Sequence, residues 1–372
     1  MKIVETKIHT IPVNHRGNWV LVEVTASDGL SGWGEASDSR DEAACIAEIE
    51  RIGQRLADRD IDPLRTAAKL MDGVAATDRL ARTPPSAIAQ ALYDLAAREK
   101  NVPVAGMLAT GDAADTTVPV YANVNRMCAS RDAETIAAAG RQVIDAGITK
   151  VKFAPFDEVS PQALETEGAR ITEPGVARLT ALREAIGSDA TLMIDCHWRF
   201  TAATGPLLAE IAKSLDIQWI EDPFDSWDRT AADKLRKQSG GRVTGGEDLY
   251  THAALEKLVS SGCIDVAIAD VKFVGGTGEL DRMCKMAGQH GVAFAPHNPS
   301  GPLCTAASAH VVAANRNAEI LEFPYGEVGW RTLLAQGERL LGGRLQVSGP
   351  GYGVDIRPDR AGAPVLMETA KP

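Results

Sequence analysis

Two patterns of apolar and polar positions divide this chain. In residues 19–25 and 31–35, apolar and polar side chains alternate on either side of Asp28-Gly29, which predicts antiparallel strands joined by a tight turn. From residue 40 to about residue 100 the apolar spacing becomes helical, and Ser86 is expected to cap the last helix of this stretch. Residues 1–115 are therefore predicted to form an α+β domain.

From residue 116 onward, short β-rich runs alternate with amphipathic helices. There are eight such runs: VPVYANV, TKVKFAP, ATLMIDCHW, IQWIEDPF, RVTGGEDL, VAIADVKF, VAFAPHN and AEILEFP. Strands that alternate with helices predict parallel pairing, and eight of them favour a closed (β/α)-barrel over an open sheet. We assign this α/β barrel to residues 116–330 and expect the charged insertion at residues 156–173 to form a long surface loop.

Four carboxylates and one histidine stand at or near the ends of five of these runs. The residues Asp195, Glu221, Glu247, Asp270 and His297 are separated by 26, 26, 23 and 27 positions. Because a strand, a helix and their two loops take about that many residues, the spacing places all five side chains at the same end of the barrel. Barrel enzymes carry their active sites at that end.

Three of these acids are expected to bind a metal ion. Asp195, Glu221 and Glu247 offer hard oxygen ligands from neighbouring strands, and no cysteine pair or HxxxH motif nearby indicates zinc. Mg²⁺ suits such a set and would leave positions open for the carboxylate of a substrate. The alternative is that each acid is solvated or salt-bridged at the start of a loop.

Two groups are candidates for moving protons. Lys150 and Lys152 alternate on one strand, so both are expected to face the same interior end, where a second cation can lower the pKa of the base. His297 follows the strand next to the one that Asp270 ends, and the acid would orient the imidazole and favour its protonated form. The alternatives are a surface KxK pair and a structural histidine.

Composition narrows the classes of function. The 372 residues have 45% hydrophobic content and a formal net charge of −11, which fits an enzyme and argues against nucleic-acid binding. The chain opens without a basic leader, and no run reaches about 18 uncharged apolar residues, so we expect a cytoplasmic protein with no membrane partner. Six cysteines without a CxxC pair are expected to be reduced thiols.

Together the motifs resemble the enolase superfamily, in its mandelate racemase and muconate lactonizing branch. The resemblance spans nearly the whole chain and rests on GWGEA, KVK, DCH, EDP, GGED, ADVKFVGG, APHNPSGP and GPGYGVDI. It implies a modified (β/α)-barrel under an α+β capping domain, with residues 331–372 returning to that domain. It also implies that the protein forms a homo-oligomer and acts on a small-molecule carboxylate.

By this resemblance, each candidate residue matches a position with a known role. Asp195, Glu221 and Glu247 match the Mg²⁺ ligands, Lys152 the base with Lys150 as its partner, and Asp270 and His297 the dyad on the opposite face. Glu322, in EILEFP, matches the acid of the last strand, which hydrogen-bonds the substrate carboxylate. The shared step is removal of the proton α to a carboxylate, which gives a Mg²⁺-stabilised enediolate.

The step that follows is indicated by His197. Its context, Asp195, His197 and Arg199, resembles the galactonate type of sugar-acid dehydratase, in which the matching histidine protonates the departing hydroxyl; the alternative is support of the metal site. Trp198 and the KxK pair depart from that type. We therefore predict a dehydratase of a polyhydroxy acid, with a racemase, epimerase or lactone cycloisomerase as the alternative, and a non-catalytic binding barrel as a third hypothesis.

Four further residues are candidates for contacts with the substrate. Arg16 and Trp19 are expected in a loop of the capping domain before its first long strand, where a polar group would suit a hydroxylated acid. Asn123 and Asn125 alternate on the first barrel strand and would bond substrate hydroxyls, although asparagine at a strand end equally forms turns. Arg199 completes this set.

Overall fold

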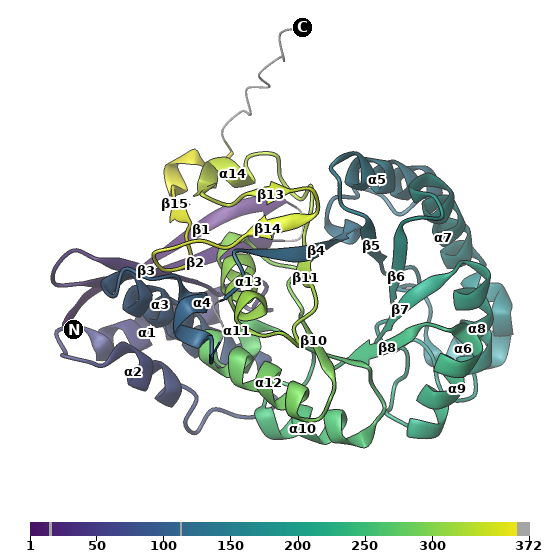
Figure 1. The fold of residues 1–372 in the computed structure, drawn as a ribbon, viewed down its shortest axis with the longest axis horizontal. Coiled ribbons are helices and arrows are strands. Elements are labelled where there is room, and N and C mark those ends of the chain that lie inside the picture. The colour runs from purple at the N-terminus through teal and green to yellow at the C-terminus, as the bar shows by residue number, and fades with distance from the viewer. Residues whose placement is uncertain (15–16, 112–113, 363–372) are drawn as a thin grey trace, which may run out of the picture.

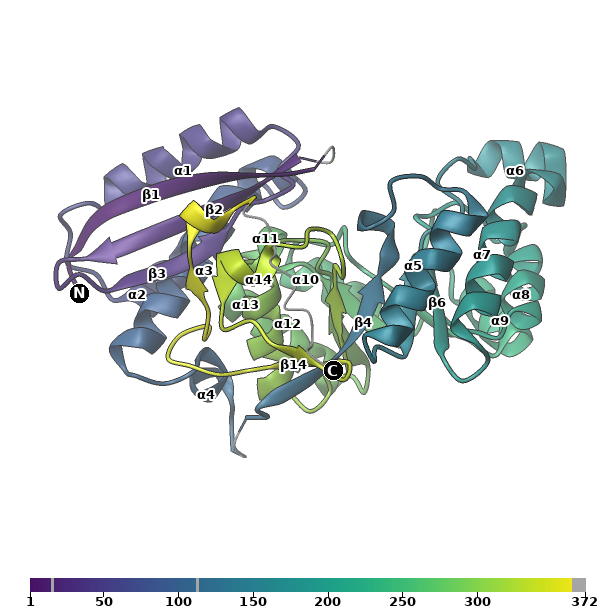
Figure 2. The ribbon, with the colours of Figure 1, turned by 90° about the horizontal axis from the view of Figure 1, so that it is seen from above.

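The computed structural model describes residues 1–14, 17–111 and 114–362. A three-stranded antiparallel sheet and the helices packed on it form a capping domain beside the barrel (Figures 1 and 2). Its elements are β1 (Ile3–Asn14), β2 (Gly17–Ala26), β3 (Ser31–Glu35), α1 (Glu42–Leu56), α2 (Pro63–Lys69), α3 (Arg79–Glu99) and α4 (Val104–Leu108). The hairpin of β2 and β3 lies where the alternating pattern predicts it.

Eight parallel strands form the barrel, in chain order around the ring. They are β4 (Thr117–Asn123), β5 (Lys150–Phe153), β6 (Thr191–Asp195), β7 (Ile217–Glu221), β8 (Arg242–Gly245), β9 (Val266–Ala269), β10 (Ala293–Pro296) and β11 (Leu321–Phe323). β11 pairs with β4, and a bridge from Phe294 to Ala318 joins β10 to the segment before β11. The predicted eight-stranded barrel is confirmed.

Helices surround these strands on the outside (Figure 1). They are α5 (Ala133–Asp145), α6 (Pro161–Glu167), α7 (Glu173–Ile186), α8 (Gly205–Ser214), α9 (Arg229–Ser239), α10 (His252–Ser261), α11 (Val271–Val274), α12 (Thr277–Gln289) and α13 (Pro302–Ala314), with short 3₁₀ turns at Val124–Arg126 and Gly168–Thr172. None of the helices in the described ranges is long and apolar enough to cross a membrane.

The inner face of the barrel is apolar below the strand ends. Buried side chains from alternate positions of its strands form this plug: Tyr121, Met193, Trp219, Val266, Ile268, Ala295 and Ile320. Side chains two positions further along a strand point into the same interior, one layer higher. Asp195 follows Met193 in this way and Glu221 follows Trp219. The carboxylates therefore lie one layer above the apolar plug, toward the C-terminal ends of the strands.

The C-terminal segment contacts both domains. It contains α14 (Arg331–Leu334), β12 (Ala335–Gln336), β13 (Leu340–Leu341), β14 (Arg344–Gln346), β15 (Asp355–Ile356) and a 3₁₀ turn at Pro358–Arg360. β14 pairs antiparallel with β4, whereas the backbone N–H of Tyr352 donates to Asp94 Oδ1 of α3 at 2.7 Å. The contact with α3 brings the segment back to the capping domain, and the pairing with β4 is one that the sequence pattern does not predict.

One carboxylate of the capping domain holds the start of a barrel helix. Glu35, at the end of β3, is fully buried and accepts hydrogen bonds from the backbone N–H groups of Gly301, Leu303 and Cys304, at 2.7, 3.1 and 3.0 Å. These amides open α13, whose first N–H groups have no partner inside the helix. The segment that follows His297 is therefore positioned by the other domain.

Two local predictions are wrong. The helix expected to start at Ser86 is α3, which begins at Arg79 because the side chain of Asp78 accepts from the N–H of Ala81 and caps it. The expected surface loop at residues 156–173 contains α6 and a 3₁₀ turn, since the side chain of Ser160 caps a helix that starts at Pro161.

Candidate active site

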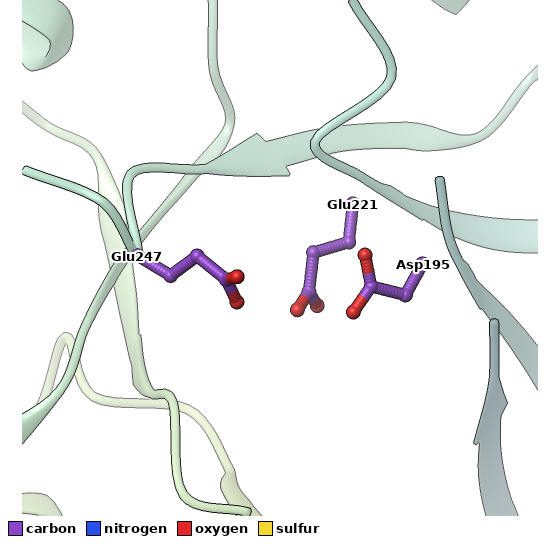
Figure 3. Close-up of side chains that lie close together, drawn as sticks. All are labelled: Asp195, Glu221 and Glu247. Carbon is purple, nitrogen blue, oxygen red and sulfur yellow. The ribbon is translucent and has the colours of Figure 1, made fainter. Parts of the chain in front are cut away.

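Three carboxylates from consecutive strands meet at the C-terminal end of the barrel. Asp195 and Glu221 are the last residues of β6 and β7, and Glu247 stands two residues after β8. Each offers an oxygen atom, and these oxygens all lie within 4.8 Å of one another (Figure 3). The structure therefore brings the three predicted metal ligands together.

The surroundings of these carboxylates fit a small, hard cation. Burial, together with the negative charges of Asp195 and Glu322, raises the pKa of Glu221 to about 8, although Lys152 opposes this. Glu247 Oε2 is buried and faces His297 Nε2 at 3.0 Å. A divalent cation would relieve the repulsion among the three acids, and oxygen donors are what Mg²⁺ prefers.

Lys152 is fully buried beside these carboxylates. Its Nζ bonds Glu221 Oε1 and lies 3.3 Å from Glu322 Oε1 and 3.7 Å from Asp195 Oδ2. Burial lowers its pKa, but the carboxylates outweigh burial and raise the pKa well above its ordinary value. The prediction that Lys150 lowers this pKa is wrong, because Lys150 stands partly exposed at the opposite end of β5 and the acids dominate.

His297 and Asp270 form the predicted pair. His297 Nδ1 lies 2.9 Å from Asp270 Oδ2, and its Nε2 lies 3.0 Å from Glu247 Oε2, with which the protonated ring forms an ion pair. Burial lowers the pKa of His297, but Glu247 and Asp270 raise it well above its usual range. The imidazole is thus held in one orientation beside the carboxylate cluster, on the side away from Lys152.

Glu322 is held by two hydrogen bonds and one ion pair. Its Oε1 accepts from Asn123 Nδ2 at 2.6 Å, its Oε2 from the N–H of Asn298 at 2.8 Å, and Lys152 forms its ion pair. Asn123 therefore orients Glu322. Its Oδ1 also accepts the N–H of Asn125 at 3.0 Å and caps the 3₁₀ turn after β4, so Asn123 is the turn former as well. The side chain of Asn125 accepts the N–H of Ala154, which follows β5, at 3.1 Å.

His197 bends back over the first carboxylate. Its φ of 45° and the φ of 58° at Trp198 turn the chain sharply after β6, and such strained conformations cluster at functional sites. His197 Nε2 lies 3.1 Å from Asp195 Oδ2, and Nδ1 lies 2.6 Å from Asp157 Oδ1. Burial lowers the pKa of His197, but these two acids raise it to about 11. Both alternatives for His197 place it at the metal cluster, as observed.

The other three candidates for substrate contacts are a buried strand residue, a partly buried loop residue and a residue that the structure does not describe. Trp19 stands inside β2, where the alternation over residues 19–25 predicts a strand, and not in the loop before it; it is 1% exposed and packs edge-on against Trp330 with ring centroids 5.5 Å apart. Arg199 is partly buried after the turn, and its Nε has no hydrogen-bond partner within the described chain. Arg16 lies outside the described residues.

Three further residues of the site are absent from the sequence-based predictions. Trp219 Nε1 donates to Glu221 Oε2 at 2.8 Å, Asn298 holds Glu322, and Asp157 of the insertion holds His197. The sequence does mark the first two, because Trp219 stands two positions before a predicted metal ligand on an alternating strand and Asn298 directly follows His297. No local pattern marks Asp157, because its contact joins two loops 40 positions apart.

A capping domain over an eight-stranded barrel with carboxylates at consecutive strand ends defines an enzyme of the enolase superfamily. Two family models match the chain: "Mandelate racemase / muconate lactonizing enzyme, N-terminal domain" over residues 3–109, and "Enolase C-terminal domain-like" over residues 134–360. The chain belongs to the mandelate racemase and muconate lactonizing enzyme family.

Several relatives of similar length are named sugar-acid dehydratases. The chain is 26% identical to D-xylonate dehydratase of Haloferax volcanii, over 94% of this chain and 86% of the relative. It is 27% identical to D-galactonate dehydratase of Verminephrobacter eiseniae, over 96% and 92%. The crystal structure of the 3,6-anhydro-D-galactonate cycloisomerase from Zobellia galactanivorans matches with a TM-score of 0.79 and 24% identity, over 97% and 98%, a likeness of fold alone.

Proposed function

We propose that this protein is a Mg²⁺-dependent dehydratase of a small polyhydroxy (sugar) acid, which it converts to a 2-keto-3-deoxy acid. The observation that carries the proposal is that two separate proton-transfer groups flank one carboxylate cluster. Lys152 approaches Asp195 and Glu221, whereas His297 approaches Glu247. The relatives named D-xylonate and D-galactonate dehydratases support the choice of reaction and of substrate class.

Asp195, Glu221 and Glu247 would hold the metal ion. When bound there, Mg²⁺ would supply positive charge against the negative charge that develops on the substrate carboxylate as the α-proton leaves. Trp219 restrains Glu221 through its 2.8 Å hydrogen bond, so that ligand is positioned before any ion arrives. Glu322, held by Asn123 and Asn298, would in its protonated form hydrogen-bond the same carboxylate of the substrate.

The reaction needs one base and one acid. Lys152 or His297, in its neutral form, removes the proton from C2, and the electron pair of the C–H bond moves into the acid group to give an enediolate. The C3 hydroxyl then leaves as water, with a proton from His297 or His197, as a C2=C3 double bond forms. The resulting enol takes a proton at C3 and becomes the 2-keto acid. Asp270 and Asp157 hold the two histidine rings throughout.

A screen for keto acids tests the proposal. Purified protein with Mg²⁺ would be incubated with mono- and diacid sugars, and 2-keto acids trapped with a carbonyl reagent. We expect one or a few related acids to be turned over by the wild-type protein, and Lys152→Ala and His297→Ala to abolish that turnover. Lys285→Ala and His252→Asn change the same residue types away from the site and should retain activity, so a loss specific to the site is recognisable.

Racemisation, epimerisation or cycloisomerisation of a sugar acid is the second candidate. The same observation favours it, because bases on two sides of one cluster can exchange a proton on both faces of a substrate. It predicts α-proton exchange in D₂O, seen by NMR, without keto acid. The dehydratase proposal is refuted if exchange occurs and no acid yields a keto acid; absence of both reactions across the set would favour a binding protein.

A further inference from the structure

Lys272 is a buried cation between the capping domain and the His297–Asp270 dyad. It stands in α11, the single helical turn that follows β9, and its side chain is 0% exposed. Its Nζ lies 3.5 Å from Asp270 Oδ2 and 4.0 Å from Asp38 Oδ2. One of these acids orients the imidazole, and the other belongs to the capping domain.

Asp38 lies in the segment between β3 and α1, residues 36–41, which we call the capping loop. Asp38 and Arg40 have φ values of 61° and 60°, so this loop is held in a conformation that side chains other than glycine adopt rarely. Arg79 stabilises it, since Nη2 donates to the backbone oxygen of Asp38 at 3.0 Å and to Oδ2 at 2.6 Å. The acid that faces Lys272 is therefore fixed from the capping side.

The helix α11 is held equally firmly by α3 of the capping domain, which lies beside it (Figure 2). Arg82 Nε donates to the backbone oxygen of Phe273 at 2.7 Å, and Nη2 to that of Val274 at 3.2 Å. The side chain of Asp270 accepts the N–H of Lys272 at 2.8 Å, so the acid of the dyad caps α11. The capping domain thus holds the backbone of α11, and α11 in turn is hydrogen-bonded to Asp270.

The ammonium of Lys272 interacts with its neighbours through its charge and not through hydrogen bonds. Its Nζ is buried and has no hydrogen-bond partner within the described chain; it forms the two ion pairs and lies 5.0 Å from the centre of the Phe273 ring. Burial lowers its pKa, but Asp270 and Asp38 raise the pKa above its ordinary value, and the group is charged. Burying a charge costs free energy that two imperfect ion pairs do not fully return, so stability alone does not account for a lysine here.

We propose that Lys272 is a positioning residue through which the capping loop holds Asp270, and hence His297, in its working orientation. Asp38 shares the ammonium with Asp270, which limits how strongly the ammonium competes with the imidazole for that acid. Without Asp38, the ammonium would move toward Asp270 and weaken the hold of that acid on the imidazole. As far as it concerns catalysis, this inference rests on the proposed function.

The hydrogen bond between His297 and Asp270 provides a test that needs no substrate. The bridging proton at Nδ1 should give a far-downfield NMR signal, assigned by its loss in His297→Asn. We expect Asp38→Asn to move this signal upfield, because the freed ammonium draws closer to Asp270. Lys272→Met should move the signal downfield, because the competing cation is gone, and Lys272→Arg should leave it near the wild-type position. Asp38 is 45% exposed, so Asp38→Asn is expected to fold even if Lys272→Met does not. An unchanged signal in Asp38→Asn overturns the coupling, even if Lys272→Met shifts it.

Kinetics on any substrate found in the screen provides the second test. We expect kcat of Lys272→Met and Asp38→Asn to fall, on the order of 10-fold to 100-fold for the first and less for the second, with a smaller change in KM. Lys285→Met is the matched control, because Lys285 pairs with Asp281 at 2.7 Å away from the site. Equal kcat in Lys272→Met and the wild type refutes the inference, whereas no turnover by the wild type refutes the proposed function and leaves the NMR test decisive.

Discussion

His310 should make the fold sensitive to acid. It is buried in α13, and its Nδ1 accepts the backbone N–H of Ala105 at 2.9 Å, so the neutral ring carries its proton on Nε2. Burial lowers the pKa of His310 to about 4, against about 6.5 in an unfolded chain. Because the folded pKa is the lower one, stability is complete above pH 6.5 and falls as the unfolded state takes up protons more readily.

These two pKa values set the size of the effect. The free energy of unfolding should fall by roughly 2 kcal/mol between pH 7 and pH 5 and by roughly 3 kcal/mol at pH 4, and level off below that. A protonated Nδ1 can no longer accept from Ala105, so acid should loosen the contact between α13 and α4 first. His310→Asn keeps an acceptor near the position of Nδ1 and cannot be charged.

Chemical denaturation at pH 7, 6 and 5 measures this contribution. The difference in unfolding free energy between the wild type and His310→Asn should shrink by roughly 2 kcal/mol as the pH falls from 7 to 5. The same substitution at His252, which lies partly exposed on α10, is the control and should leave the pH dependence nearly unchanged. Parallel pH profiles for the wild type and His310→Asn would contradict the assignment of a buried, neutral ring.

Three further predictions concern the site. Removing Mg²⁺ with a chelator should abolish activity and, from a concentration 100 times Kd, lower the Tm by roughly 3 °C; an unchanged Tm would count against the site. Trp219→Phe removes the donor to Glu221 and should weaken Mg²⁺ binding about 10-fold by calorimetry, unless that hydrogen bond is dispensable. Asp157→Asn should slow keto-acid formation about 10-fold while α-proton exchange continues, and equal losses in both would remove His197 as the acid.

The barrel and its metal cluster could be predicted because both follow from chain-local regularities. Each strand is a short β-rich run, and one polar residue recurs at about the length of a strand-helix unit, so Asp195, Glu221 and Glu247 are placed without knowledge of any long-range contact. The pairing of Asp270 with His297 follows from adjacent parallel strands in the same way.

The residues that modulate the site could not be predicted in that manner. β1 is not predicted, because most of its positions are at least partly exposed and show no clean alternation. The approach of Asp157 to His197 depends on how two loops turn, which no periodicity encodes. The charge state of Lys152 depends on acids from three other strands, whose combined effect exceeds that of its sequence neighbour Lys150.

The contact of Glu35 with the start of α13 has a consequence for how this protein can change. The two oxygens of Glu35 serve three amides of the barrel, so a barrel made without residues 1–115 would leave those donors without their anion at the positive end of a helix. Gly301 belongs to the same joint, because a Cβ there would lie 2.7 Å from Glu35 Oε1. The capping domain is therefore not a detachable module, and transplanting specificity between relatives should succeed by grafting its loops rather than by exchanging whole domains.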